Sequence, residues 1–139
     1  MNLLVLNDMY IRLWDPRQQD RRCVKTYSCP AKVRAADVVR SWHGKQSAFV
    51  TADADGYIRV WTLEHDSPIV ETKLGETSIS SLKVCSLSER HFIVTGDAKG
   101  HVQISEIVHK GQSLEIKKST SISFDSGVLG LALRLDDKK

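Results

Sequence analysis

The sequence predicts an all-β protein of antiparallel strands, because one strand–turn–strand unit is clear and is repeated along the chain. The clearest copy is FVTADADGYIRVWTL at 49–63. Phe49–Thr51 favours a strand, and the Asp-Ala-Asp-Gly after it favours a tight turn, since Asp side chains bond nearby backbone amides and Gly accepts a positive φ. The returning segment Tyr57–Trp61 alternates strictly, with Ile58 and Val60 on one face. A hairpin of this kind is marginal alone in water, so it predicts further strands beside it.

The same unit is found upstream and downstream. YIRLW at Tyr10–Trp14 matches YIRVW at Tyr57–Trp61, at an offset of 47 positions. A third copy at Phe92–Ser105 follows the second at an offset of 44 positions, with Ser105 where Trp61 stands. A period in the mid-forties, with a strand pair in each copy and a Trp at the end of the first two, is typical of the repeat that forms one blade of a β-propeller.

These units resemble WD repeats. IRLWD at 11–15 is similar to the signature strand of that family, and DGYIRVW at 55–61 is a second match. The resemblance covers about Leu3 to Leu135, and it implies repeat-structural roles for five residues: Asp8, Trp14, Asp15, Asp55 and Trp61. In the family, an Asp in the turn six residues before the Trp stabilises each blade, and Asp8 and Asp55 hold that place. The third copy departs from the pattern, because Lys99 and Ser105 replace the Asp and the Trp, and the Gly-His pair that precedes a blade's innermost strand is absent.

The strands that we expect fall into repeat units of similar length. In chain order they are 3–6, 10–15, 23–28, 38–42, 47–51, 57–63, 69–73, 79–85, 91–95, 101–107, 114–118 and 128–135. The units are about 1–37, 38–78 and 79–127, with the start of a further blade at 128–139. The resemblance therefore implies a partial β-propeller of four-stranded antiparallel blades, about two complete blades plus parts of two more, with the ring not closed.

A propeller typically has four to eight blades that close into a ring and so protect the strand edges. About three blades cannot close such a ring, and bare blade faces invite association. We therefore expect the chain to be a fragment or truncated member of a longer propeller. Assembly of several copies into a ring is the alternative.

Composition and charge are those of an ordinary globular protein. The 139 residues are 41% hydrophobic and 27% charged, and a net charge of +3 from 20 basic and 17 acidic residues is not the concentrated basic stripe of a dedicated nucleic-acid binder. Cys23, Cys29 and Cys85 lack metal-ligand spacing and indicate a reducing compartment. The apolar start is too short for a signal peptide, and no run has the length of a membrane span. We expect an intracellular protein, cytoplasmic or nuclear, without membrane association.

The candidate chemical motifs are better explained as turns and surface positions. The acidic turn at 53–56 with Glu64 in twelfth place is similar to a calcium loop, but such a loop needs an oxygen ligand and a Gly where this chain has Tyr57 and Ile58. GDAKG at 96–100 leads into a strand, so it lacks the helix N-terminus that binds phosphate. Metal-ligand spacing is also absent from the five histidines, which are His43, His65, His91, His101 and His109. We expect no catalytic, cofactor-binding or metal-binding residue, no small-molecule substrate and no enzymatic activity.

Two basic clusters and one short motif are the candidate partner-binding features. The Arg pair at 21–22 with Lys25, and the Lys pair at 117–118, give weak support for nucleic-acid binding, because exposed aromatic residues are not interleaved with them. WDPR at 14–17 is similar to the W-D-x-R ending of propellers that serve as substrate receptors of cullin-4 ubiquitin ligases. By that resemblance, Arg17 is a partner-binding candidate on a rim where an adaptor docks through an acidic group.

The function that we expect is a non-catalytic protein–protein interaction scaffold built from WD repeats, with other proteins as partners. The alternatives are a substrate-receptor propeller of a cullin-4 ubiquitin ligase and a WD-repeat protein associated with RNA processing. An enzyme ranks last, because the sequence offers neither a nucleophile–base set nor a metal cluster. Fold alone does not determine function, so this expectation depends on the resemblance and on the missing catalytic signals.

Overall fold

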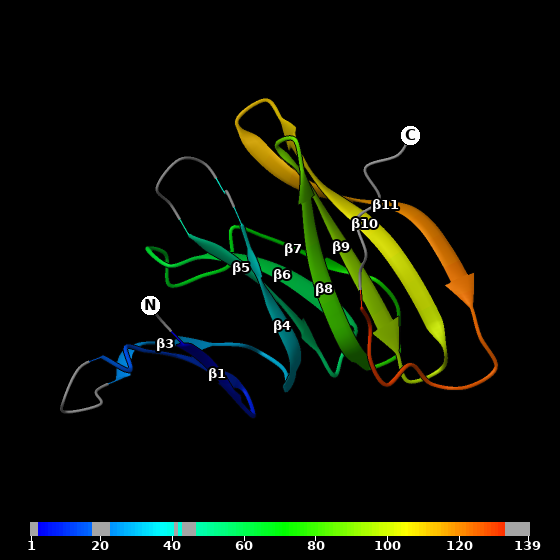
Figure 1. The fold of residues 1–139 in the computed structure, drawn as a ribbon, viewed down its shortest axis with the longest axis horizontal. Coiled ribbons are helices and arrows are strands. Elements are labelled where there is room, and N and C mark those ends of the chain that lie inside the picture. Colours follow the sequence, from blue (N-terminus) through cyan, green and yellow to red (C-terminus); the bar gives the residue numbers. More distant parts are fainter. Residues whose placement is uncertain (1–2, 18–22, 41, 43–46, 133–139) are drawn as a thin grey trace.

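Three antiparallel β-sheets make up the described part of the chain (Figure 1). The computed structural model describes residues 3–17, 23–40, 42 and 47–132, and within these ranges it contains β-strands and no helix. The strands are β1 (Leu3–Asn7), β2 (Tyr10–Trp14), β3 (Cys23–Ser28), β4 (Val33–Val39), β5 (Ala48–Asp53), β6 (Tyr57–Thr62), β7 (Val70–Lys73), β8 (Ile79–Leu87), β9 (Arg90–Asp97), β10 (His101–Lys110) and β11 (Ser113–Ser123). The all-β prediction is confirmed. No helix in the described part has the length and apolar character that a membrane crossing needs.

Each sheet is a simple meander, in which every strand pairs with its neighbour in the sequence. The first sheet has the order β1-β2-β3, the second β4-β5-β6-β7, and the third β8-β9-β10-β11. The second and third sheets share one register, since Thr51 pairs with Arg59 and Thr95 pairs with Gln103. Residues that are 44 positions apart in the sequence therefore occupy equivalent positions in the second and third sheets.

The turns that set this register need glycine at one position. Gly56 ends the β5–β6 turn with a φ of +87°, and Gly100 ends the β9–β10 turn with a φ of +93°. A Cβ on Gly56 would lie 2.1 Å from the carbonyl oxygen of Gly75. Side chains are strained at such φ values, and here the space is also taken.

The second sheet lies between the other two and is covered on both faces. Every residue of β5 is buried, and in β6 only Tyr57 is partly exposed. The core shared with the first sheet contains Ile11, Leu13, Tyr27, Cys29, Val33, Phe49 and Trp61. The core shared with the third sheet contains Val39, Trp42, Ala48, Val50, Ala52, Ile58, Val60, Ile79, Leu82, Ile93, Ile107 and Ile116. The strict alternation of β6 thus sends Trp61 to one neighbour and Ile58 and Val60 to the other.

The first strand of the second sheet starts earlier than we expected. The prediction placed it at 38–42, whereas β4 spans Val33–Val39, so the predicted unit boundary at 37/38 falls inside a strand. Asp37 lies inside this strand, where a carboxylate is unusual. Its Oδ2 accepts a hydrogen bond of 2.8 Å from the Val84 backbone amide of β8, and its Oδ1 accepts one of 2.9 Å from Val38. Asp37 is therefore tolerated because it joins the second sheet to the third.

The expected further strand at 128–135 is not formed in its described part. Residues 128–132 have no strand assignment, and 133–135 lie outside the described residues. The segment is nevertheless fixed at its start, where the Val128 amide donates to the Asp97 carbonyl at 2.8 Å and Ser80 Oγ donates to the Val128 carbonyl.

Candidate functional site

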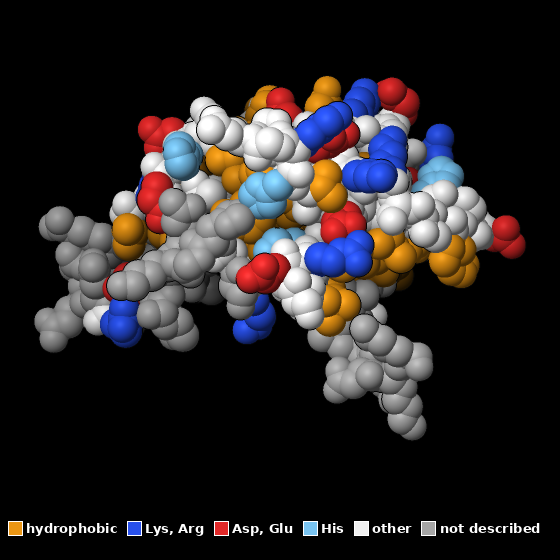
Figure 2. All heavy atoms as spheres, turned by 90° about the horizontal axis from the view of Figure 1, so that it is seen from above, with side chains coloured by type: hydrophobic (Ala, Val, Ile, Leu, Met, Phe, Trp, Pro, Cys, Tyr) orange, Lys and Arg blue, Asp and Glu red, His pale blue; other side chains and the backbone are white. Residues whose placement is uncertain are grey.

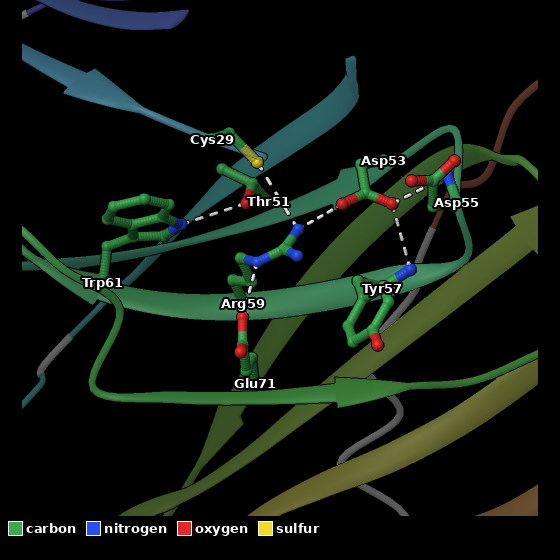
Figure 3. Close-up of polar contacts among 8 residues, drawn as sticks. All are labelled: Cys29, Thr51, Asp53, Asp55, Tyr57, Arg59, Trp61 and Glu71. Carbon is green, nitrogen blue, oxygen red and sulfur yellow. Dashed lines mark hydrogen bonds and ion pairs between the residues drawn. The ribbon is translucent and has the colours of Figure 1, made fainter. Parts of the chain in front are cut away.

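The carboxylate of Asp53 holds the turn between β5 and β6 (Figure 3). Its Oδ1 accepts hydrogen bonds from the backbone amides of Asp55 at 2.9 Å and Tyr57 at 3.1 Å, and its Oδ2 accepts one from Arg59 Nη1. The Asp53 side chain has no solvent exposure. A buried carboxylate is costly unless its oxygens are paired, so the turn and the arginine are both needed to keep it there.

Arg59 carries this network across three strands and into the segment after the first sheet. Its guanidinium donates from Nε to Glu71 Oε2 at 2.6 Å and from Nη1 to Cys29 Sγ at 3.4 Å, and it lies 4.7 Å from the Tyr57 ring centroid. The side chain is only 5% exposed. Burial alone would lower the pKa of Arg59, but the hydrogen bonds to Asp53 and Glu71 raise it overall. Arg59 therefore carries its positive charge inside the protein, where Asp53 and Glu71 balance it.

Trp61 joins the second sheet to the first through an aromatic cluster. Its Nε1 donates to Thr51 Oγ1 at 3.0 Å, and its ring stacks on Phe49 with centroids 5.9 Å apart. The edge of Tyr27 from β3 meets both rings, at 5.8 Å and 5.3 Å between centroids, and its hydroxyl donates to the Leu63 carbonyl at 2.9 Å. Edge-on and stacked pairs of this kind stabilise beyond their buried area, so the contact fixes the first two sheets against each other.

The third sheet repeats the aspartate turn without the arginine. Oδ1 of Asp97 accepts from the amides of Lys99 and His101, both at 2.9 Å, and Oδ2 faces the His101 Nδ1 at 2.8 Å. Burial alone would raise the pKa of Asp97, but the hydrogen bonds from His101 and Lys99 lower it overall. Unlike the buried arginine, the His101 side chain is 54% exposed.

A groove opens beside this turn, between the third sheet and the β7–β8 connection that leads into it. Gln103 stands where the second sheet has Arg59, and its β11 partner is Ser121 where Arg59 has Glu71. The groove has a volume of about 270 Å³. Its lining comes from the β7–β8 connection and from the four strands of the third sheet: Leu74, Gly75, Glu76, Thr77, Ile79, Thr95, Asp97, His101, Gln103, Ser121 and Ser123. Shorter side chains in the third sheet thus leave room where the second sheet is filled.

Arg17, the partner-binding candidate of the sequence, lies in an exposed loop after β2. Its backbone amide donates to Asp15 Oδ1 at 3.0 Å and its Nε to the same oxygen at 3.2 Å, while the arginine side chain remains 69% exposed. These hydrogen bonds lower the pKa of Asp15. The motif therefore forms a local ion pair whose guanidinium faces solvent.

The remaining repeat-structural candidates lie apart from one another. Asp8 sits at a φ of 56° in the β1–β2 turn, and its carbonyl accepts from the Val33 amide at 2.8 Å. The side chain of Asp55 is exposed, and its contribution to the turn is the amide that Asp53 binds. Trp14 is partly exposed, on the face of β2 opposite the first core, whereas Trp61 is fully buried.

The basic clusters are surface features in so far as they are described. Lys25 Nζ donates to the Leu63 carbonyl at 2.9 Å and pairs with Asp66 at 3.0 Å, while the Lys pair at 117–118 is exposed. Residues 21–22 lie outside the described residues. On the face drawn in Figure 2, acidic side chains lie beside basic ones.

The histidines and cysteines serve local contacts. His91 Nδ1 lies 2.7 Å from Ser86 Oγ, and its ring centroid lies 5.3 Å from that of Trp42. His65 and His109 line an open hollow of about 360 Å³ together with Trp42. Among the described residues, no group of three or more His, Cys, Asp or Glu side chains is placed to hold a metal ion, and the three cysteines are free. His43 lies outside the described residues.

The sequence prediction missed Asp53, Arg59 and Glu71. One signal was available, since an Asp ends the strand before the turn at 53 and again at 97, four residues ahead of the returning strand in both repeats. The partners of Arg59 could not be found in this way, because Cys29 lies 30 positions away and Glu71 becomes a neighbour only through the β6–β7 register.

The sequence matches no protein-family model and none of the curated proteins. Solved structures do match. One of them, described as the computationally designed Ika4 protein, has a TM-score of 0.67 over 96% of this chain and 74% of its own, with 18% sequence identity. At this identity the likeness concerns the fold alone.

Proposed function

We propose that the chain is a segment of a WD-repeat β-propeller and works as a non-catalytic protein–protein interaction scaffold. The propeller assignment is supported by the repeated strand plan, in which equivalent residues of the second and third sheets share one register. It is also supported by Trp61, the family's signature residue, which is buried and bonded to Thr51. In this assignment, each of the three sheets is one blade.

The observation that carries the scaffold function is the groove between the third sheet and the β7–β8 connection. It is open to solvent, and it is lined by the third sheet and by the connection that joins this sheet to the second, so a bound segment would contact the third sheet and this connection together. Its polar lining includes the carboxylates of Glu76 and Asp97, which favour a basic partner, while Thr77 and Ser121 supply hydroxyl groups.

A peptide array tests this function. Labelled protein is applied to short peptides of basic, neutral and acidic composition, and we expect it to bind basic peptides. Ser121→Arg, which places a long cationic side chain in the groove, should abolish that binding. Ser67→Arg makes the same change at an exposed position outside the groove and should leave the binding intact. Failure of every peptide to bind, or equal binding by the two variants, would contradict the proposal.

The cullin-4 receptor function is a second candidate, favoured by the exposure of Arg17. A side chain that is 69% exposed and that pairs, among the described residues, with Asp15 of its own loop can exchange Asp15 for an acidic group on an adaptor. The test is an adaptor pull-down that compares the parent with Arg17→Ala, and with Lys117→Ala as a control of the same charge change. Recovery of the adaptor should fall only for Arg17→Ala, and equal recovery by all three proteins would remove this candidate.

A further inference from the structure

In the second sheet, the position equivalent to the groove is filled by the side chain of Arg59. There, Asp53 receives a guanidinium from the same sheet, and Cys29 and Glu71 surround that group. In the third sheet the aspartate is kept as Asp97, and its Oδ1 binds two turn amides in the same way. The aspartate that accepts hydrogen bonds from the turn amides is therefore present in both sheets.

The arginine that donates to this carboxylate is present only in the second sheet. The third sheet has Gln103 at the arginine position, and Ser121 at the glutamate position. The connection that precedes its first strand contains Gly75, and no atom lies within 4 Å of the place where a Cβ would be. The volume left by these smaller residues is the groove of about 270 Å³.

We propose that this groove is a binding site for an arginine side chain of a partner protein, with Asp97 as its main acceptor. The inference depends on the proposed scaffold function and names the residue type that the scaffold recognises. The guanidinium of the partner would bind Asp97 as the chain's own Arg59 binds Asp53. Glu76 also lines the groove; its carboxylate pairs with Lys73 at 2.9 Å and is exposed to solvent, and it can supply a second acceptor to the bound guanidinium.

The chemistry of the acceptors selects arginine over lysine. A carboxylate oxygen has two lone pairs, so Asp97 Oδ2 can accept from a guanidinium while it faces His101 Nδ1. The His101 side chain is more than half exposed and can also turn away into solvent. A planar guanidinium presents several donors in a fixed fork, and it can bridge Asp97 and the Gln103 side chain, whereas an ammonium group is a compact point charge that loses more hydration.

The test is an NMR titration of the labelled chain with Nα-acetyl-arginine amide, using Nα-acetyl-citrulline amide as the uncharged isostere. We expect saturable shifts of the Asp97, Lys99 and His101 amides with the arginine compound, at a Kd on the order of 1 mM for so small a ligand. Citrulline should give none. Asp97→Asn should weaken the binding at least tenfold, while Glu115→Gln, the same kind of change on an exposed part of β11, should leave it unchanged.

Three results would overturn the inference: equal shifts with citrulline, arginine-induced shifts that avoid the β9–β10 turn, or unchanged affinity in the folded Asp97→Asn variant. The peptide array separates this failure from that of the scaffold function. Peptides without arginine that bind in a manner sensitive to Ser121→Arg would preserve the scaffold while removing the arginine site.

Discussion

Replacing Asp53 by asparagine tests the buried network most strongly. Asp53→Asn keeps the size of the side chain and an oxygen for the turn amides, but it removes the charge that Arg59 faces. Because both side chains are almost completely buried, the change removes the buried carboxylate partner of the guanidinium and leaves it with the half-exposed Glu71. Removing one partner of a buried ion pair costs about 3–5 kcal/mol, which is a large part of the roughly 5–15 kcal/mol that a domain of this kind has in total.

A double-mutant cycle isolates the pair itself. Arg59→Met alone should also cost about 3–5 kcal/mol, because Asp53 Oδ2 then lacks its charged donor. The combined variant should lose less than the sum of the two single changes, by roughly 1–3 kcal/mol, since no unpaired charge is left in the core. Urea unfolding of the parent and the three variants, followed by tryptophan fluorescence, gives the three changes in the free energy of unfolding. Fluorescence reports unfolding because Trp61 is buried in the folded state.

Two matched variants show whether the cost comes from burial. Glu71 binds the same guanidinium but is 50% exposed, so Glu71→Gln should cost less than about 1 kcal/mol. Asp97→Asn in the third sheet, where the paired histidine is exposed, should also cost less than Asp53→Asn. A loss below about 1 kcal/mol for Asp53→Asn, or strict additivity in the cycle, would show that Asp53 and Arg59 are not a coupled buried pair.

Three further predictions concern other parts of the repeat. Trp61→Phe should cost about 1–3 kcal/mol in urea unfolding, because a buried threonine hydroxyl loses its donor, whereas Trp14→Phe should cost less than about 1 kcal/mol. Gly56→Ala should destabilise more than Gly111→Ala in thermal unfolding, since both have a positive φ but only the first would push a Cβ into backbone. The pKa of Asp97 is lowered in the folded state, so its contribution to stability is present above pH 3.8 and is lost as the pH falls through its folded pKa. A pH series of unfolding curves should therefore differ from that of Asp97→Asn above pH 3.8 and converge with it below.

Much of the strand pattern could be predicted from the sequence, because it depends on local chemistry. The Asp-x-x-Gly turns and the alternation of Tyr57–Trp61 fix a hairpin and its two faces, and the 44-residue offset carries the result to β9 and β10. The start of β4 could not be predicted in this way. β4 contains Asp37, whose carboxylate accepts a hydrogen bond from an amide of β8, 47 positions further along the chain.

The candidate site was harder to predict than the strands. The Arg59 network and the groove depend on which side chains lie next to each other in the folded chain, such as Glu71 across the β6–β7 pairing and Cys29 from the segment after β3. A sequence pattern does not show these neighbours. Trp61 could be identified because its position repeats that of Trp14. The groove is present because Gln103 and Ser121 are shorter than Arg59 and Glu71 at the equivalent positions of the second sheet. A site formed by the absence of large side chains leaves no motif in the sequence.

The most direct test of the account is the stability of Gln103→Arg, which places in the third sheet the arginine that the second sheet has. We predict that its urea midpoint exceeds that of Gln103→Lys, because only a guanidinium can repeat the Arg59 contact with the aspartate of the turn. The gain should vanish when Asp97→Asn is added. A Gln103→Arg variant no more stable than Gln103→Lys, or a gain in stability that persists with Asp97→Asn, would contradict the claim that the groove and the Arg59 position are equivalent arginine-binding sites.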